Sequence, residues 1–507
     1  MKTSSIRSLC ETFLARIRRN IEVYFAYAMM VSFIVGIAAV AIYGFPSGCF
    51  KPLAISAGGF IALSLLVRRP AWLLPVIFIL GFGWHGIAAM QLDSFAGQPD
   101  EAVFFSGKVT EVMSREENYF SRLSEQEQTG YTFIIQGEDS SGWQGRLMVI
   151  SSPVEPQVGD SLQVAGMVYD FTETYNFNLP QNNYLRNNGI AAVIRPVPDG
   201  ITFSRLAAAA SPYTWGAAVR EQIFSDMSSL PQIQQALLKG IAFGETGMLS
   251  QRQNSILQQT GIMHIFAVSG LHIGYVVLLG SAVMEFWRPR LRFPLWLGPL
   301  AVAALVMFFD FVVGFSPSVL RATIMTMAAL VSQIVGERHH GTYALIIAAF
   351  LLLLAEPMWI FQAGFLLSFA AAAGIVFGAS YLRLLVPSQA LSVSLAAQLM
   401  TMPILAYFFN TVSFIGLLLS PVIVIGAGMV VILVLLAMLL SFVGLAYIPL
   451  VGAGMLAELM YKATELFAAL PNAFTYIISP SVSILILYYL LILAAYFCLK
   501  RAQNAEY

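Results

Sequence analysis

An apolar run from residue 413 to residue 443 contains no charged side chain. A helix needs about 20 mainly apolar residues to cross the hydrocarbon core of a bilayer, so this run is long enough to span one. Charged residues make up 11% of the 507, whereas a soluble domain carries about 25%. The sequence therefore predicts a polytopic α-helical membrane protein with about 10–12 spans. The other candidate spans lie near 24–45, 52–67, 71–90, 262–285, 294–314, 318–336, 341–355, 361–382, 388–408 and 481–498.

Basic residues between the apolar runs predict how the chain crosses the membrane. Residues 1–20 hold five basic side chains and one acidic side chain, and basic loops stay on the cytoplasmic side. The basic loops further along the chain alternate consistently with that assignment. We therefore expect a cytoplasmic N-terminal segment (1–23), three N-terminal transmembrane helices (24–90) and a cytoplasmic tail (501–507).

Residues 91–205 differ from the rest of the chain in charge and in periodicity. They hold 15 acidic and 7 basic side chains. Period-2 alternation between turn residues is typical of short strands, and about five strands in about 100 residues suit an OB-like barrel. Because three spans precede this segment, we expect an extracytoplasmic all-β domain inserted into the membrane protein. The expected strands lie at 103–112, 131–135, 145–150, 160–169 and 190–194.

Two other segments are polar on one face only. Residues 206–260 have a helical pattern, with Pro231 and Gly240 as helix punctuation, and we expect amphipathic helices along the outer membrane surface. The segment 446–470 carries three charged residues at helical spacing. It either lies in the interface or spans the membrane with one face against protein. The remaining spans, within 261–500, form the expected transmembrane core.

The stretch 261–274 places His264, Ser269 and His272 in a segment that otherwise reads as a membrane span. Polar side chains in hydrocarbon are unfavourable unless they face protein or water. Three interpretations are open: hydrogen bonds to neighbouring helices, a break in the helix at Gly270 that lines a pore, and a Ser–His hydrolytic site. The surroundings of Ser269 do not match the Gly-x-Ser-x-Gly elbow of hydrolases.

Three later blocks carry further polar residues. Asp310 ends one span, and Arg321 lies about one turn inside the next, where it pairs with Asp310, extends to the interface or contacts an anion. Glutamine and serine within a span usually make interhelical hydrogen bonds. Together, however, these blocks favour a shared polar interior. The channel-lining candidates are His264, Ser269, His272, Asp310, Arg321, Gln362, Ser368 and Gln398.

Several kinds of site have no signal in the sequence. There is no phosphate-binding loop and no dinucleotide fingerprint. The three cysteines and five histidines do not have the spacing of metal ligands. We therefore predict no cofactor, no metal and no catalytic residue, and we do not expect this chain to be a nucleotide-driven motor by itself.

The polar blocks, in their order along the chain, resemble those of the ComEC family of competence proteins. His264-Ile-Phe-Ala-Val-Ser-Gly-Leu-His-Ile273 is similar to the family signature His-Leu-Leu-Ala-Ile-Ser-Gly-Leu-His-Ile. The blocks at 318–325, 361–369 and 398–403 resemble the next three, and 177–190 resembles the run that closes the family's OB-like domain. The resemblance covers roughly residues 25–500.

The resemblance implies a channel for single-stranded DNA in the inner (cytoplasmic) membrane of bacteria during natural transformation. Many family members end in a metallo-β-lactamase-like domain thought to degrade the strand that is not imported, and this chain has no His-x-His-x-Asp-His run. The expected partners are single-stranded DNA, membrane lipids and a separate DNA receptor, nuclease and cytoplasmic motor; a homo-oligomer is left open. Where the family usually has Ala-Asn-Leu before a proline, this chain reads Leu417-Leu-Leu-Ser-Pro421.

The outer domain is expected to handle the incoming strand. Non-specific DNA binding uses basic grooves and stacking aromatic rings, and the acidic excess of 91–205 opposes a polyanion. DNA contacts therefore require a local basic stripe, with Arg115, Arg122, Arg146 and Arg186 as candidates. Two alternatives remain: a membrane-embedded Ser/His hydrolase acting on a lipid or envelope substrate, and a small-solute transporter with the same fold.

Overall fold

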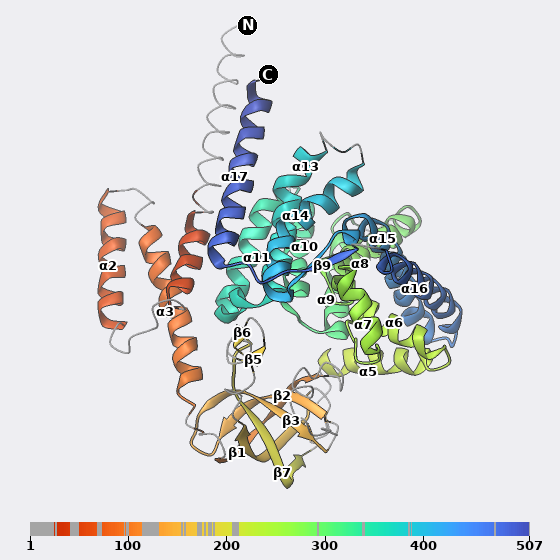
Figure 1. Cartoon of the computed structure of the whole chain (residues 1–507), viewed down its shortest axis with the longest axis horizontal. Coiled ribbons are helices and arrows are strands. Elements are labelled where there is room, and N and C mark those ends of the chain that lie inside the picture. The colour runs from red at the N-terminus through yellow and green to blue at the C-terminus, as the bar shows by residue number, and fades with distance from the viewer. Residues whose placement is uncertain are drawn as a thin grey trace. The chain divides into compact units, whose positions relative to one another are not determined.

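The chain is mostly helical, with one small barrel, in a computed structural model (Figure 1). Six helices in the described part of the chain are long and apolar enough to cross a membrane: Leu74–Asp93, Gly270–Leu291, Pro317–Val335, Ala363–Leu382, Leu391–Phe409 and Ile415–Ser441. Shorter apolar helices lie at Ala28–Val40, Leu297–Val313, Gly341–Ala355 and Val482–Tyr496. The structure describes residues 25, 28–40, 50–67, 73–95, 97, 101–113, 131–153, 156, 159–169, 175–176, 179–180, 185, 188–204, 212–291, 294–336, 340–383, 386, 388–470 and 473–505. The predicted class, a polytopic α-helical membrane protein with an inserted OB-like β domain, is confirmed.

One of two compact units consists of residues 1–96 and 340–360. It contains the helix Ala28–Val40, α2 (Phe50–Val67), α3 (Leu74–Asp93) and α11 (Gly341–Ala355). A Cβ on Gly36 would lie 2.2 Å from the Phe78 carbonyl oxygen, so the first helix and α3 touch through their backbones. The Phe33 ring packs 5.3 Å from that of Phe350. Although α11 falls within 261–500, it therefore packs with the N-terminal helices.

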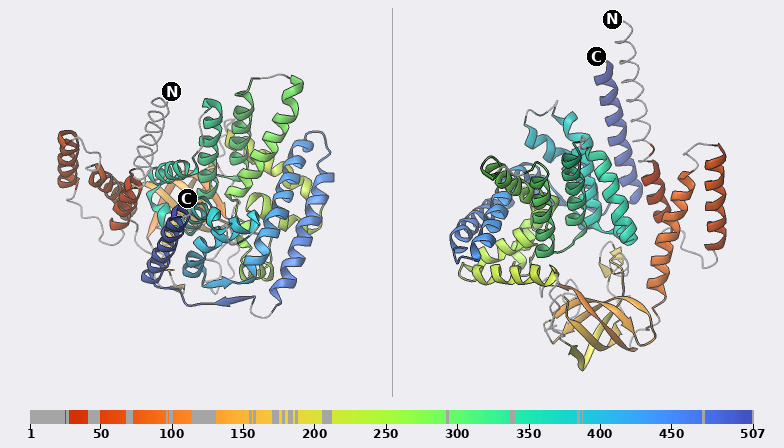
Figure 2. Two further views of the ribbon diagram at one scale, coloured as in Figure 1. Left: turned by 90° about the horizontal axis from the view of Figure 1, so that it is seen from above. Right: turned by 180° about the vertical axis from the view of Figure 1, so that it is seen from behind.

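The second unit, residues 97–339 and 361–507, contains a closed five-stranded barrel. The strands are β1 (Ala102–Met113), β2 (Tyr131–Asp139), β3 (Gln144–Ser152), β4 (Ser161–Tyr169) and β7 (Ile190–Ser204), in the order β1-β2-β3-β7-β4. Figures 1 and 2 show the barrel in orange and yellow. β3 and β7 pair in parallel, and the other neighbours are antiparallel. A small hairpin of β5 (Tyr175–Asn176) and β6 (Leu179–Pro180) precedes β7. All five predicted strands are present.

The barrel has an apolar interior and a partly covered outside. Large side chains such as Phe105, Phe133 and Leu147 are at most 1% exposed and fill the interior, and burying each contributes about 1.5–3 kcal/mol. A second apolar cluster of Ile134, Met148, Ile150, Leu185, Ile190 and Val193 covers part of the outer surface of β2, β3 and β7. The outer surface of β1 and β4 does not contribute buried residues to that cluster.

The helices of the second unit follow the predicted order closely. They are α5 (Pro212–Met227), α6 (Gln232–Phe243), α7 (Gln251–Gln259), α8 (Gly270–Leu291), α9 (Leu297–Val313), α10 (Pro317–Val335), α12 (Ala363–Ala373), η4 (Gly374–Gly378, a π-helical turn), α13 (Ala379–Leu382), α14 (Gln389–Phe409), α15 (Ile415–Ser441), α16 (Tyr447–Ala468) and α17 (Val482–Ala505). The strands β8 (Thr411–Ser413) and β9 (Phe474–Tyr476) pair between them. One apolar core joins α5 to α10 with α15 and α16.

The segment 446–470 forms α16, whose polar edge packs against protein. Gln234 of α6 donates a 2.9 Å hydrogen bond to Glu458, which also pairs with Lys462 at 2.7 Å. Arg252 of α7 pairs with Glu465 at 3.0 Å. Glu458 and Glu465 thus contact α6 and α7, whereas Lys462 is exposed and pairs with Glu458 on its own helix. Whether α16 lies in the interface or spans the membrane stays a prediction.

Candidate functional site

The stretch 261–274 is not one helix. After α7 a single 3-10 turn (η2, Met263–Ile265) follows, and α8 begins at Gly270. The Ser269 hydroxyl accepts a 3.3 Å hydrogen bond from the Leu271 N–H, and the Ser269 carbonyl accepts one from the His272 N–H. A serine that accepts from the first turn acts as an N-cap. The helix therefore starts at Gly270 instead of breaking there.

The His272 side chain, 3% exposed, is held at both ring nitrogens. Its Nε2 lies 2.7 Å from the carbonyl oxygen of Ile241 in α6. Because a carbonyl can only accept, Nε2 carries the hydrogen and Nδ1 is the acceptor. Nδ1 receives the backbone N–H of Ser269 at 3.1 Å, and the Ser269 hydroxyl is also 3.1 Å away. His272 thus ties the N-terminus of α8 to α6.

His264 lies apart from His272, in the turn before α8. Its Nδ1 is 2.8 Å from the Gly261 carbonyl oxygen, and its side chain is exposed. The continuous helix on which the two histidines would share a face is not present. His264 remains an accessible polar residue near the start of α8.

Arg321 brings α8, α10 and α12 together. Its Nε donates a 2.7 Å hydrogen bond to the Ser368 hydroxyl, and Nη1 lies 3.5 Å from the Met325 sulfur. The guanidinium carbon is 6.0 Å from the centre of the Phe369 ring. A Cβ on Gly270 would lie 2.5 Å from Nη2. The guanidinium therefore rests against the first residue of α8.

The Arg321 charge has no acidic partner in the described part of the chain. An unpaired guanidinium within a membrane span is energetically unfavourable. The adjoining N-terminus of α8 carries about half a positive charge, which disfavours a cation and favours an anion. Because Arg321 is only half-buried, this arrangement is suited to an anionic ligand.

The ion pair between Asp310 and Arg321 that the sequence left open is not formed. Asp310 is 0% exposed, and its Oδ2 accepts the Thr323 hydroxyl at 2.7 Å. Its Oδ1 has no hydrogen-bond partner among the described residues. Side chains two positions apart on a helix point about 200° apart, so α10 presents Thr323 to Asp310 and Arg321 to the opposite side.

The other predicted residues make contacts of two kinds. The Gln362 amide, just before α12, donates a 2.7 Å hydrogen bond to Asn188, two residues before β7, and so connects the helices to the barrel. Gln398 donates to Ser394 one turn earlier on its own helix. Four of the predicted residues, Arg321 with Ser368 and Ser269 with His272, thus form two pairs that meet at Gly270, whereas the described contact of Gln398 is to Ser394.

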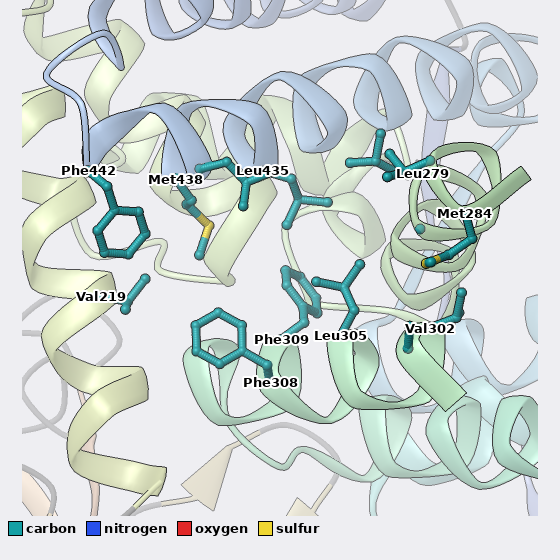
Figure 3. Close-up of a pocket in the computed structure, with 14 residues that line it drawn as sticks. Val219, Leu279, Met284, Val302, Leu305, Phe308, Phe309, Leu435, Met438 and Phe442 are labelled. Carbon is teal, nitrogen blue, oxygen red and sulfur yellow. The ribbon is translucent and has the colours of Figure 1, made fainter. Parts of the chain in front are cut away.

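An apolar cavity of about 200 Å³ lies elsewhere, between α5, α8, α9 and α15. Phe308, Phe309 and Met438 point into it (Figure 3). All the residues that line it are apolar. Such a lining suits hydrocarbon and leaves the phosphates of a nucleic acid without partners, so this cavity is separate from the polar site.

The predicted basic stripe on the outer domain is only partly within the described residues. Arg146 lies on β3, half-buried, opposite Gln136 of β2. Arg115, Arg122 and Arg186 lie outside the described residues. A stripe through all four arginines therefore stays a prediction.

Sequence reasoning missed three partners in this site. Thr323 lies two positions after Arg321 on α10, and Phe369 directly follows Ser368 on α12. Helical spacing could have shown that Thr323 points away from Arg321, but not that it meets Asp310 on the next helix. The Ile241 carbonyl that accepts from His272 has no such signal, because every residue provides a backbone carbonyl.

A comparison with protein families covers the region that contains these contacts. The family model described as Competence protein matches residues 241–502, just over half of the chain. The chain belongs to the competence protein family. The matched region includes the N-terminus of α8, Arg321 and Ser368, so the polar site lies in the part of the chain that defines the family.

Curated relatives match shorter segments of the chain. ComE operon protein 3 of Bacillus subtilis is 29% identical over 202 residues, 39% of this chain and 26% of that protein. Recombination protein 2 of Haemophilus influenzae is 31% identical over 142 residues, 27% of this chain and 18% of that protein. An uncharacterized protein of Aquifex aeolicus is 31% identical over 182 residues, 36% of this chain and 42% of its own length.

The chain thus aligns with less than half the length of these curated relatives. No solved structure matches the chain. The resemblance to competence proteins seen in the sequence is confirmed, and the chain is a membrane protein by its apolar helices.

Proposed function

We propose that this protein is the inner-membrane channel through which single-stranded DNA enters the cytoplasm during natural transformation. The observation that carries the proposal is the half-buried guanidinium of Arg321 within a candidate membrane span, which pairs with no acidic side chain among the described residues. Guanidinium groups bind phosphate through paired N–H donors. Membership of the competence family favours DNA as the source of that phosphate.

The residues around Arg321 have distinct roles in this proposal. Ser368 occupies Nε and fixes the orientation of the guanidinium. The contact of Nη1 is to the Met325 sulfur, a weak acceptor that a phosphate oxygen can replace, so the Nη atoms serve a phosphate. Because Gly270 has no side chain, the N-terminus of α8 can lie close to the Arg321 guanidinium. The partial positive charge of the helix N-terminus then adds to that of Arg321 in attracting an anion. A single phosphate site holds each nucleotide weakly enough to release it, as conduction requires.

The proposed organisation follows the segments expected from the sequence. The barrel within 91–205 receives the strand outside the cytoplasm, 206–260 lies along the outer membrane surface, and 261–500 contains the path. The hydrogen bond between Gln362 and Asn188 supports communication between barrel and helices. A separate receptor, nuclease and cytoplasmic motor complete the pathway, with both termini of this chain in the cytoplasm.

A deletion strain tests the function directly. The gene is deleted, and the uptake of fluorescent DNA into the cytoplasm and the frequency of transformation are measured with and without a plasmid copy. We expect both to fall to background and to be restored by the plasmid. Normal transformation in the deletion strain would contradict the channel proposal. Loss of uptake of a small solute, with transformation retained, would favour the small-solute transporter.

One contact favours a second candidate, a membrane-embedded Ser/His hydrolase. The Ser269 hydroxyl lies 3.1 Å from His272 Nδ1, within reach of a general base, and Ile241 orients the ring from the other side. The same Nδ1, however, accepts the Ser269 backbone N–H, and the hydroxyl already caps α8. These bonds favour a structural role for the pair.

Substitution of Ser269 distinguishes the two roles. As a helix cap, Ser269→Ala lowers the free energy of unfolding by about 1 kcal/mol and leaves DNA uptake measurable. As a nucleophile, Ser269 reacts with a fluorophosphonate probe, and Ser269→Ala abolishes the labelling. Covalent labelling of the intact protein at Ser269 would therefore establish the hydrolase and contradict the cap.

A further inference from the structure

Three neighbouring strands of the barrel carry a bare apolar patch on their outer side. Phe104 on β1 is 64% exposed, Met167 on β4 is 43% exposed and Val197 on β7 is 36% exposed. Met167 lies opposite Ala102 of β1 and Arg195 of β7. Side chains two positions apart on a strand point to the same side. Phe104, Met167, Arg195 and Val197 therefore form one surface, which we call the β1–β4–β7 face.

The cation of this face is stacked on an aromatic ring. The guanidinium carbon of Arg195 lies 4.8 Å from the centre of the Tyr169 ring, over its face. Arg195 Nε is buried without a hydrogen-bond partner, and no ion pair joins Arg195 to a carboxylate of the described chain. A guanidinium plane of this kind is a surface on which a nucleobase stacks.

The face is cationic, although the segment 91–205 is acidic. Across positions 102–108 of β1, 161–169 of β4 and 195–197 of β7, the ionisable side chains on the outer side besides Tyr169 are Lys108 and Arg195. Glu138 of β2 lies opposite Ser106, so it borders the face between Phe104 and Lys108. A polyanion therefore meets positive charge at Arg195, on the side of the face away from β2.

The surface of β2 and β3 is less suited to the same ligand. In OB folds this surface commonly binds oligonucleotides, but here Ile134 and Met148 are buried in the apolar cluster that also contains Leu185. The charges that remain on its outer side, Glu138 and Arg146, have opposite signs. Among the described residues of the barrel, the exposed aromatic side chain is Phe104 of the β1–β4–β7 face.

We infer that the β1–β4–β7 face binds single-stranded nucleic acid, with one base stacked on Phe104 and another on the Arg195–Tyr169 pair. The inference rests on the proposed function and specifies where the outer domain holds the incoming strand. Phe104 is in register with Ala165, so Tyr169 lies about 13 Å further along the strand direction. Met167 and Val197 form the apolar floor between the two stacking sites. Duplex DNA does not offer its base faces, so the ligand is single-stranded.

Binding to the full-length protein in nanodiscs of zwitterionic lipid tests this face. The probe is a fluorescent oligothymidylate of about twenty nucleotides, and anisotropy gives its Kd. Phe104→Leu keeps apolar area but removes the aromatic face, and we expect it to weaken binding about 5- to 100-fold. Phe104→Tyr retains a ring and binds within about twofold of the unchanged protein.

Arg195→Ala tests the second stacking site and its charge. We expect a similar loss of affinity and a salt dependence whose slope is smaller by about 1. Trp215→Ala on α5 is the matched control, because Trp215 is as exposed as Phe104, at 65%, but lies outside the face. It should leave the Kd unchanged.

Two outcomes would overturn the inference. One is an unchanged Kd for both Phe104→Leu and Arg195→Ala. The other is that the same two variants bind the oligothymidylate with an unchanged Kd but bind vesicles of anionic phosphatidylglycerol more weakly. That result would make the face a membrane contact. Failure of the channel itself is distinguishable, because it would appear as normal transformation in the deletion strain while oligothymidylate binding still depends on Phe104.

Discussion

The Nε atom of Arg321 donates a 2.7 Å hydrogen bond to the hydroxyl of Ser368, 47 positions further along the chain. The bond joins α10 to α12 and uses only one edge of the guanidinium. The Nη atoms extend past the Met325 sulfur toward Gly270, at the positive end of α8. Serine is neutral, so the bond orients the charge without neutralising it.

Replacement of Arg321 tests whether this charge acts on the cargo. Arg321→Ala is expected to lower DNA uptake at least about tenfold, because a charge-assisted contact to phosphate is lost. Arg321→Lys should give an intermediate value, since lysine keeps the charge but not the planar fork. Uptake of fluorescent DNA is normalised to the amount of protein in the membrane. If Arg321→Ala does not accumulate in the membrane, the residue is structural.

Gly270→Ala tests the position of the guanidinium without removing its charge. The new Cβ would lie 2.5 Å from Arg321 Nη2, the flexible end of the side chain, so the guanidinium moves and the helix persists. We expect uptake to fall while thermal stability is retained. Gly274→Ala in the same helix is the control, because a Cβ there meets nothing within 4 Å. Equal uptake by the two variants would contradict the proposed placement.

The buried contact between Asp310 and Thr323 is expected to support stability. Thr323→Val leaves Asp310 without its hydroxyl donor and should lower the free energy of unfolding by about 1–3 kcal/mol. Asp310→Asn removes a buried charge while its oxygen still accepts from Thr323, so it should be nearly neutral. Thermal unfolding in detergent measures both. Ser332→Ala, whose hydroxyl bonds only within α10, should change stability less than Thr323→Val.

Asp139, in the turn between β2 and β3, is expected to make the barrel sensitive to acid. Partial burial acts to raise the pKa of Asp139, but hydrogen bonds from Ser141 and from the Trp143 N–H outweigh it and hold the pKa below its ordinary value of 3.8. A lowered folded-state pKa gives stability that is present above the ordinary pKa and is lost as pH falls through the folded value.

Hydrogen-exchange protection factors of β2 and β3 measure this effect. They should fall as the pH is lowered below about 4, and Asp139→Asn should lower protection at neutral pH and flatten the pH dependence. Glu138→Gln, an exposed neighbour, should retain the pH dependence. A pH dependence that survives in Asp139→Asn would assign the acid sensitivity to another group.

The sequence by itself determined the class of fold and most element boundaries. Apolar runs of spanning length have few alternatives to helices in hydrocarbon, because every backbone group must be paired. The strand alternation within 91–205 likewise predicted the five barrel strands, since period-2 patterns have one buried face. The polar blocks near His264, Arg321 and Ser368 were visible for the same reason, as side chains unfavourable in a membrane span.

Only the tertiary structure decided which of those polar residues meet. Spacing along one helix gives the face of a side chain but not the neighbouring helix, so Asp310 and Arg321 were a possible pair in the sequence. In the structure α10 presents Thr323 to Asp310 and Arg321 to the opposite side. His272 Nε2 donates to the backbone carbonyl of Ile241, and a backbone carbonyl cannot be predicted as a partner from the residue type, because every residue has one. The cationic β1–β4–β7 face was hidden because net charge averages over a segment, whereas strand register selects which side chains share a surface.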